Sequence, residues 1–437
     1  MNFLNYENNK NKSMICEKTL PNGWRFGKIT YFCEVQLGKM LQPEPKNEND
    51  VLKPYLRSAN LAWHGVDTRD VKKMWFSQYE LEKYRLQKND ILVSEGGDVG
   101  RTSLWSNNGE MYIQNAINRI RCLTNKQSPK FIYYWFYYLK NSGYIDILCN
   151  SSTISHYTAE KVKATQIVVP SIKEQESIVS FLDKKTSAID ALIEKKQKLI
   201  QLLEEKRSAL ISQVVTKGLD PNLPMKDSGI NWLGKIPDCW DLKRIKFYVR
   251  SINKKIHYEN TKLPYIGLEN IESWTGKKIE DNSVTSEGVV CCFEAKDVLF
   301  GKLRPYLAKT YLAKDDGTCS TEFLVFRPCA YVDPEYLQYF LLSPKFINTV
   351  NASTYGAKMP RANWEFIANL YLACPSLLVQ KQIIQFLNDE TVKIDLIKTK
   401  IKDAIERLKE YRAALITNAV TGKIALTAEK DKRFAYE

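Results

Sequence analysis

The sequence feature that most constrains the fold of this chain is an internal duplication. In a chain of 437 residues, the segment that begins at Pro170 returns without a gap 205 residues later, at Pro375. A repeat of this kind indicates two copies of one structural unit, so we expect the two copies to fold alike. The matching residues include Gln175 and Gln380, Ile189-Asp190 and Ile394-Asp395, and Arg207 and Arg412.

Both copies carry the apolar spacing of a long amphipathic helix. Leucine and isoleucine recur at heptad core positions, which predicts helices over 170–217 and 375–422. Pro170 and Pro375 stand just before the expected helix starts, Gly218 stops the first helix and Gly422 ends the second. An apolar seam needs a partner, and the nearest one is the second copy, so we expect an intramolecular antiparallel coiled coil. The predicted seam residues are Leu182, Ile189, Leu192, Leu199, Leu203, Leu210, Leu387, Ile394, Ile397, Ile401, Leu408 and Leu415.

The rest of the chain repeats more loosely. Leu-Pro-Asn-Gly-Trp at 20–24 matches Ile-Pro-Asp-Cys-Trp at 236–240, and Asp90-Ile91-Leu92 matches Asp297-Val298-Leu299. Short β-branched and aromatic runs alternate with glycine turns and one predicted helix in each region, which indicates an α+β fold. We expect two related globular domains separated by the two long helices. The predicted boundaries are an N-terminal extension over 1–19, domains over 20–169 and 236–374, a connector over 218–235 and a tail over 423–437.

An excess of basic residues points to a polyanionic partner. The chain has 64 lysines and arginines against 50 aspartates and glutamates, a net charge of +14, which favours nucleic acid. The long helices are nearly neutral, so the surplus belongs to the globular regions and their flanks. Two basic domains held by rigid helices would contact DNA at two places.

Missing motifs exclude several classes of enzyme. The sequence has no GxxxxGK[ST] phosphate-binding loop, and no consecutive prolines, so it also lacks the Asn/Asp-Pro-Pro-aromatic motif of amino-methyltransferases. Ten cysteines without a CxxC pair and three histidines do not suggest a zinc site. No apolar run is long enough to span a membrane, and no signal-peptide core is present. We therefore expect a cytoplasmic protein with no cofactor or metal of its own.

Two pairs of loops carry candidate DNA contacts. The loops at 96–101 and 301–306 follow predicted strands, and those at 151–157 and 353–361 precede the strand that leads into each long helix. Arginine on a short loop can reach guanine or phosphate, and hydroxyl and amide groups suit groove edges. A solvated turn explains any single residue equally well. The candidate DNA-binding residues are Arg57, Arg101, Ser155, His156, Tyr157, Lys302, Arg304, Tyr306, Lys358 and Arg361.

The order of domain, helix, domain, helix resembles the specificity subunit of type I restriction-modification systems. The connector from Lys217 to Pro237, with Trp240, is similar to that family's inter-domain segment. So are Leu303-Arg304-Pro305-Tyr306-Leu307 and Cys319-Ser320-Thr321-Glu322-Phe323. Two departures stand out. The first nineteen residues lack the Met-Lys-Asp-Ser-Gly-Ile lead-in found at 225–230, and the loop at 96–101 differs in length and charge from its counterpart.

The resemblance implies that each globular region is a target recognition domain that reads one half of a split sequence in double-stranded DNA. The helices would set the spacing and bind two methyltransferase (M) subunits, and two restriction (R) subunits would complete a complex for DNA methylation and host defence. S-adenosylmethionine, ATP and magnesium would belong to those partners, and this chain would be non-catalytic.

Two other classes of function remain open at this point. One is a recognition subunit of a type II-like restriction or methylation system, with recognition domains fused to a nuclease or methyltransferase. That class needs catalytic motifs that the sequence lacks. The other is a coiled-coil scaffold that binds DNA without reading bases, for which binding would depend steeply on salt but show no sequence preference.

Overall fold

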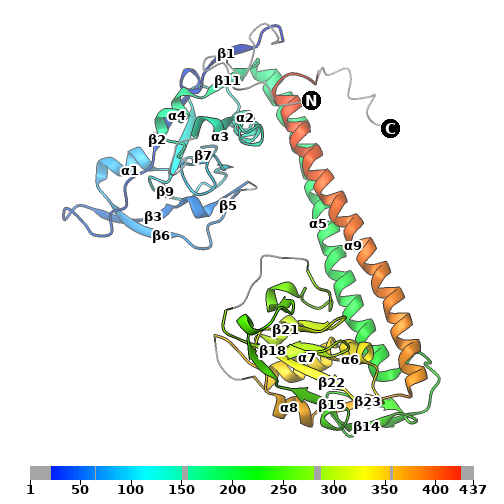
Figure 1. Cartoon of the computed structure of the whole chain (residues 1–437). Helices are drawn as coiled ribbons and strands as arrows, with labels where there is room; N and C mark the ends of the chain where they lie inside the picture. Colours follow the sequence, from blue (N-terminus) through cyan, green and yellow to red (C-terminus); the bar gives the residue numbers. More distant parts are fainter. Residues whose placement is uncertain (1–20, 64, 150–155, 280–286, 355–357, 425–437) are drawn as a thin grey trace. The chain divides into compact units, whose positions relative to one another are not determined.

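The structure, a computed structural model, describes residues 21–63, 65–149, 156–279, 287–354 and 358–424. The described residues pack as two compact units. The first lies within Met1–Glu194 and Ala404–Glu437, and the second is Lys195–Asp403. Each unit holds one globular domain together with one end of each long helix, which Figure 1 labels α5 and α9. Packing therefore divides both long helices near their middles, whereas the boundaries drawn from the sequence fall at their ends.

The first domain is built on an antiparallel sheet with strand order β2-β10-β7-β8. Helix α2 (Pro129–Asn141) packs on β7 and β8. A second sheet has the order β6-β3-β9, and β1 pairs with β11. The strands are β1 (Arg25–Lys28), β2 (Cys33–Leu37), β3 (Val51–Leu56), β4 (Leu61–Ala62), β5 (Gly65–Val66), β6 (Lys72–Phe76), β7 (Ile91–Ser94), β8 (Thr102–Leu104), β9 (Tyr112–Ile113), β10 (Ile117–Cys122) and β11 (Gln166–Val169); the other helices are α1 (Gln78–Tyr84), α3 (Tyr144–Cys149) and α4 (Ala159–Ala164).

The second domain repeats this plan with the sheet order β15-β22-β19-β20, on which α6 (Pro334–Leu341) packs. Another sheet has the order β16-β18-β21-β17, and β14 pairs with β23. The predicted relationship between the two domains is confirmed. The strands are β12 (Met225–Asp227), β13 (Lys235–Pro237), β14 (Asp241–Arg244), β15 (Val249–Ile252), β16 (Lys255–His257), β17 (Tyr265–Ile266), β18 (Val289–Phe293), β19 (Val298–Gly301), β20 (Thr310–Leu312), β21 (Gly317–Cys319), β22 (Phe323–Pro328) and β23 (Tyr371–Cys374); the other helices are α7 (Pro344–Ala352) and α8 (Trp364–Asn369).

In both domains, an ion pair between a buried aspartate and a half-buried arginine holds the central sheet. Arg121 donates two hydrogen bonds of 2.7 Å to Asp90, and Arg327 donates two of 2.7 and 2.8 Å to Asp297. Each carboxylate also accepts a backbone N–H from the turn before its strand. Bidentate pairing and the extra donor compensate the cost of burying the aspartate. The duplication is therefore visible in single side chains as well as in the topology.

The two long helices, α5 (Ile172–Lys217) and α9 (Leu377–Val420), run antiparallel in each unit, as predicted. In the first unit, Arg412 Nε of α9 lies 2.9 Å from Asp190 Oδ1 of α5. In the second unit, Arg207 Nη1 of α5 lies 2.7 Å from Asp395 Oδ1 of α9. The two ion pairs are equivalent under the 205-residue offset, so they join the helices reciprocally.

Three predicted seam residues are wrong. Leu192, Leu199 and Ile397 are 42%, 45% and 45% exposed. The next residues along the chain, Ile193, Ile200 and Lys398, are half-buried in their place. A seven-residue spacing fits both sets, and the inward set continues to Arg207 and Arg412, whose interhelical ion pairs fix the rotation of the helices. Of the other predicted seam residues, Leu182, Ile189, Leu387, Ile394, Ile401 and Leu415 are buried, and Leu203, Leu210 and Leu408 are half-buried.

The hydrophobic core of each domain includes the ends of both long helices. In the first unit, Leu182 of α5 and Ile416 of α9 are buried in one cluster with Trp135 of α2. In the second unit, Val215 of α5 and Leu387 of α9 are buried in the cluster that contains the apolar face of α6. Because these side chains share a core, each domain and its helix ends form one packed body.

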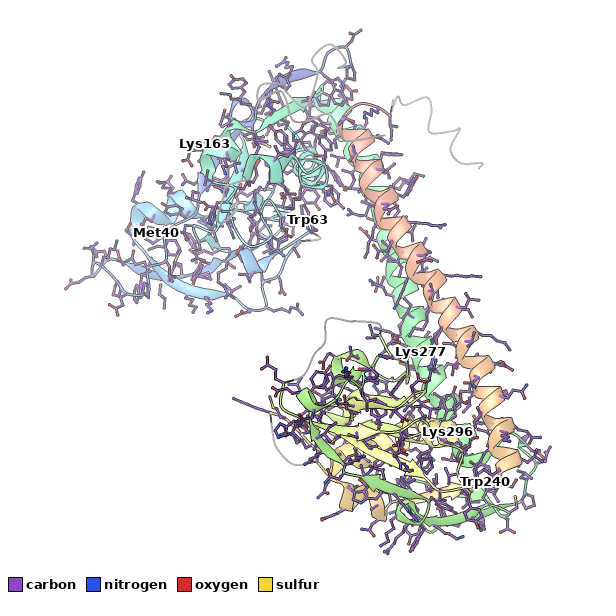
Figure 2. The ribbon with its side chains drawn as sticks, viewed as in Figure 1. Met40, Trp63, Lys163, Trp240, Lys277 and Lys296 are labelled. Carbon is purple, nitrogen blue, oxygen red and sulfur yellow. The ribbon has the colours of Figure 1, made fainter. Side chains whose placement is uncertain are left out.

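A glycine that lies against a tryptophan follows the end of each long helix. Gly218 has φ +78°, and a Cβ there would lie 3.2 Å from the indole of Trp240, which Figure 2 labels at the base of the second domain. Gly422 has φ +73°, and a Cβ there would lie 3.2 Å from the indole of Trp24. The left-handed conformation and the close approach both favour glycine at these helix ends.

A buried glutamine fastens each domain to the start of a long helix. Gln175 Oε1 accepts a hydrogen bond of 2.7 Å from the backbone of Ser128, and Gln380 Oε1 accepts one of 2.7 Å from the backbone of Asp333. Each amide also donates to the carbonyl of the proline before its helix, at 2.9 and 2.8 Å. Ser128 and Asp333 are the N-caps of α2 and α6, so each glutamine couples two helix starts.

We predict that Gln380→Ala destabilises the second domain by about 2–4 kcal/mol, because the buried Pro375 carbonyl and the part-buried Asp333 N–H lose their hydrogen-bond partner. Urea unfolding followed by tryptophan fluorescence measures the change. Gln382→Ala, at an exposed position of the same helix, is the matched control and should leave the transition unchanged. Indistinguishable transitions for the two variants would contradict this role of Gln380.

Candidate nucleic-acid interface

Segments that are far apart in the sequence meet at one edge of the first domain. We call this edge junction 1; it comprises residues 38–41, 56–58, 95–101, 114–116 and 156–157. Three backbone hydrogen bonds tie these segments together. Gln114 N donates to Leu56 O at 3.1 Å, Glu95 N donates to Ala116 O at 2.9 Å, and Tyr157 N donates to Glu95 O at 2.9 Å.

The equivalent edge of the second domain, junction 2, comprises residues 266–268, 302–309, 320–322 and 358–362. The same three backbone bonds recur there. Ser320 N donates to Ile266 O at 3.0 Å, Lys302 N donates to Glu322 O at 2.9 Å, and Ala362 N donates to Lys302 O at 2.8 Å. The two loops predicted in each domain are thus brought together by one shared backbone framework.

Junction 2 gathers four of the predicted basic residues. Arg304 and Lys358 are exposed, whereas Lys302 and Arg361 are half-buried. The Arg361 guanidinium binds the carboxylate of Glu322 at 3.1 and 3.2 Å, which holds this arginine in place. Arginine in a fixed orientation suits planar recognition of a base edge or phosphate. The predicted Tyr306 is 44% exposed on the same loop.

Arg304 has a strained backbone. Its φ of 52° and ψ of 60° lie in the left-handed region, which disfavours residues other than glycine. Its backbone N–H donates to Pro360 O at 2.8 Å, so the loop at 301–306 is held against the segment at 358–362. Strained conformations of this kind concentrate at functional sites, because surrounding structure must hold them.

The strand pairing shows which loop residues are equivalent. Ser94 N donates to Arg101 O at 2.9 Å, and Gly301 N donates to Lys309 O at 2.8 Å, so Arg101 corresponds to Lys309. The side chains agree: Arg101 Nη2 donates to Ser58 O at 3.3 Å and Lys309 Nζ donates to Leu268 O at 2.7 Å. Both side chains therefore bind their loop to a neighbouring turn through a backbone carbonyl. This role was not predicted from the sequence.

The position of Arg304 is occupied in junction 1 by Gly97, which has φ +74°. The exposed arginine of junction 2 therefore has no counterpart in junction 1. Glu95 likewise takes the place of Lys302; burial raises the pKa of the Glu95 carboxyl, and the charge of His156 partly opposes this. The two junctions share a backbone but differ in side-chain size and in the sign of charge.

The remaining predicted residues of the first domain have different surroundings. His156 is exposed beside Gly96. Arg57 lies at junction 1 and pairs with Asp70 at 2.6 Å, with its side chain one-quarter exposed. Ser155 lies outside the described residues.

The assignment of Tyr157 to the interface is wrong. Its side chain is fully buried, and its hydroxyl is hydrogen-bonded to Thr165. Burial raises the pKa of this phenol. Tyr157 is the last residue of the loop at 151–157. Its backbone N–H is bonded to Glu95 O, and its side chain lies in the domain core.

Within the described residues, no three histidine, cysteine or acidic side chains come together as a candidate metal site. The same part of the chain contains no helix with the length and apolar character needed to cross a membrane.

Comparison with known proteins identifies the family. The family model for the type I restriction modification DNA specificity domain matches residues 21–202 and 245–407. These two matches cover most of the chain and most of each globular domain. The chain therefore belongs to the type I restriction-modification DNA specificity family.

Individual relatives are distant. The type I restriction enzyme EcoDI specificity subunit of Escherichia coli is 23% identical over 198 residues, which span 44% of this chain and 44% of that protein. The alignment thus spans less than half the length of this relative.

Two solved structures share the fold along most of the chain. A chain from a study of complex assembly and conformational transition of the type I R-M system has a TM-score of 0.68 at 14% identity, covering 93% of this chain and 99% of that one. The HsdS subunit from Thermoanaerobacter tengcongensis has a TM-score of 0.51 at 14% identity, with coverage of 93% and 98%.

We predict that Arg304→Gly leaves the thermal unfolding temperature unchanged or raises it, because glycine removes a left-handed strain of about 1–2 kcal/mol. Circular dichroism measures the unfolding. Gly100→Ala is the opposite case and should lower the unfolding temperature, because Gly100 has φ +80° and the added Cβ would lie 2.7 Å from the Ile145 side chain. An unfolding temperature for Arg304→Gly well below that of the wild type would show that the arginine is structural.

Proposed function

We propose that this chain is the DNA sequence-specificity subunit of a type I restriction-modification complex, in which each domain reads one half of a split target. The observation that carries the proposal is that junctions 1 and 2 share a backbone framework while their side chains differ. Two domains that bind different sequences in the same kind of duplex can position themselves on the DNA with the same backbone structure. They need different side chains to contact different base edges.

The side chains at the junctions suit these two tasks. In junction 2, Arg304 and Lys358 are exposed cations that can reach a phosphate or a guanine edge. In junction 1, Arg57 and Arg101 are partly exposed and each is held by an internal partner. Positive groups held in place favour positioning on the phosphate backbone, which fixes register without carrying sequence information.

The long helices support the role of a spacer. Each domain shares its core with helix ends, so a domain cannot turn freely about them. Half-sites contacted on one face of the duplex would lie about one turn, roughly 34 Å, apart. In this proposal the helices fix that separation.

Exposed apolar side chains on the helices support binding of partner subunits. Large apolar groups that remain in water commonly mark a protein interface. We infer that two M subunits bind here, with S-adenosylmethionine and the methyl transfer on their side, and that two R subunits bring ATP, magnesium and cleavage. This chain would direct the chemistry without catalysing it. The exposed residues are Leu192, Leu199 and Leu202 on α5, and Val392, Leu396 and Ile397 on α9.

Methylome sequencing tests the proposal. Cells that carry this chain and its neighbouring M subunit should show N6-methyladenine in one split motif. Deletion of this chain alone should abolish that methylation, because the M subunit loses its guide, and a plasmid copy of the chain should restore it. An unchanged methylome in deleted cells that still express the M subunit would contradict the proposal.

A further inference from the structure

A turn at the centre of junction 1 holds two side-chain amides that are not among the candidate DNA-binding residues. Residues Gln114 and Asn115 lie between β9 and β10, and their backbone is hydrogen-bonded on several sides. Gln114 N donates to Leu56 O at 3.1 Å, Asn115 N donates to Lys39 O at 2.9 Å, and Gln114 O accepts from Ile117 N at 2.9 Å. The turn therefore has a fixed position.

Gly38 presses directly against this turn. A Cβ at position 38 would lie 2.2 Å from Gln114 O, closer than any real contact allows. Lys39 N also donates to Ile113 O at 2.9 Å, so the segment at 38–41 and the turn are locked together. The backbone that carries the two amides is thus held in one position, which base reading requires.

The two side-chain amides differ from the neighbouring polar side chains in their hydrogen bonding. Both side chains are half-buried, and neither amide has a hydrogen-bond partner among the described residues. The surrounding polar side chains are engaged: Arg57 binds Asp70, and Arg101 binds the carbonyl of Ser58. A half-exposed amide with its donor and acceptor available can bind a ligand that offers the complementary pair.

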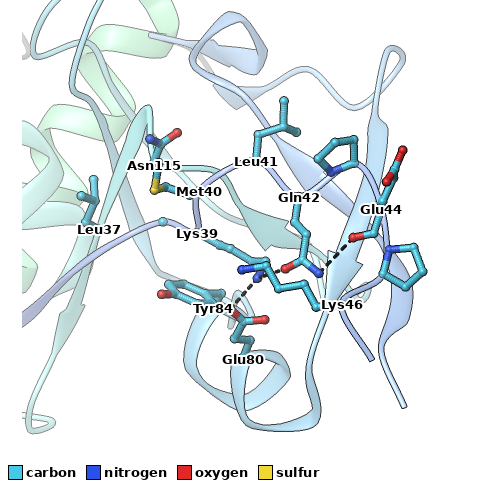
Figure 3. Close-up of a pocket in the computed structure, with 13 residues that line it drawn as sticks. Leu37, Lys39, Met40, Leu41, Gln42, Glu44, Lys46, Glu80, Tyr84 and Asn115 are labelled. Carbon is cyan, nitrogen blue, oxygen red and sulfur yellow. Dashed lines mark hydrogen bonds and ion pairs between the residues drawn. The ribbon is translucent and has the colours of Figure 1, made fainter. Parts of the chain in front are cut away.

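Asn115 lies at the rim of a cavity of about 740 Å³, beside Met40 (Figure 3). Within the cavity lining, Lys39 is already bound to Glu80 and, at 2.8 Å, to Gln42. Met40 is 76% exposed, and Figure 2 labels it at the margin of the first domain. An exposed apolar side chain thus stands next to an amide at the same edge.

We propose that Gln114 and Asn115 determine the sequence specificity of the first domain by reading an adenine-thymine pair in the major groove, with Met40 as an apolar contact for the thymine methyl. This inference rests on the proposed function. A carboxamide presents a donor and an acceptor together, which matches N7 and the N6 amino group of adenine. An apolar group completes the pattern, because thymine carries the only methyl group in that groove.

The equivalent positions of junction 2 are occupied by different chemistry. Ser320 and Thr321 stand there, since Ser320 N makes the backbone bond that Gln114 N makes in junction 1. The Ser320 hydroxyl accepts a hydrogen bond of 3.2 Å from the backbone of Glu322. A single hydroxyl cannot make the two-point contact of a carboxamide, so these two positions of junction 2 cannot read adenine in this way.

The test is methylome sequencing of Gln114→Ala and Asn115→Ala chains, each expressed with the neighbouring M subunit. We expect one position of one half-site to lose its preference for an A·T pair by about 5- to 150-fold, as for a lost two-point base contact. The other half-site should stay unchanged. Asn141→Ala, which removes an exposed amide on α2, is the matched control and should leave both halves as in the wild type.

The variant Asn115→Asp distinguishes a loss of base recognition from a loss of folding stability. The shape is kept while the donor is lost, and a carboxylate accepts from the N4 amino group of cytosine, so the preferred base should move from adenine toward cytosine. A wild-type split motif that stays the same in all three variants overturns this inference and leaves the proposed function standing. Equal weakening of both half-sites, with a lower unfolding temperature, also overturns it. If the wild type shows no split motif, the proposed function itself fails.

Discussion

The packing of both long-helix ends into each domain core is the constraint on which the rest of this structure depends. Leu182 and Ile416 close the core of the first domain, as Val215 and Leu387 do in the second. A domain cannot turn about its helix ends without opening that core, and Gln175 and Gln380 add buried hydrogen bonds at the same places. Because each domain and its helix ends form one packed body, the exposed side chains of junctions 1 and 2 can change without opening that core, and recognition can change with them.

Much of the fold could be predicted from the sequence because apolar residues recur at regular spacings and the whole helix segment recurs after 205 residues. The 205-residue offset matches residues that share a structural task, such as Gln175 and Gln380, and it predicts two related domains and an antiparallel helix pair. The rotation of the helices could not be predicted in the same way. A seven-residue spacing is satisfied by Leu192 and by Ile193 alike, and the choice between them depends on interhelical ion pairs of Arg207 and Arg412 that no local pattern displays.

The interface was less accessible to sequence reasoning, because it is assembled by backbone hydrogen bonds between distant segments. The sequence predicts the loop pairs because they recur at similar places in the two domains, but it does not predict the directions of their side chains. Tyr157 points into the core, and Arg101 points to a carbonyl. One side-chain difference between the junctions can be predicted from the sequence. The match of Asp90 with Asp297 has an offset of 207 residues, and the same offset aligns Gly97 with Arg304. Nothing local marks Gln114 or Asn115, whose position depends on contacts with residues 38–39 and 56.

The most direct test of the account is a chain in which residues 21–169 are replaced by a second copy of residues 237–374. Asp183→Asn should accompany the exchange, because Glu335 binds Asn388, the equivalent of Asp183, at 2.8 Å. Methylome sequencing with the neighbouring M subunit reads the result. If each domain reads its own half-site on a shared frame, the methylated motif will contain two copies of one wild-type half and none of the other. Persistence of both original halves in cells that express this chain would contradict the account.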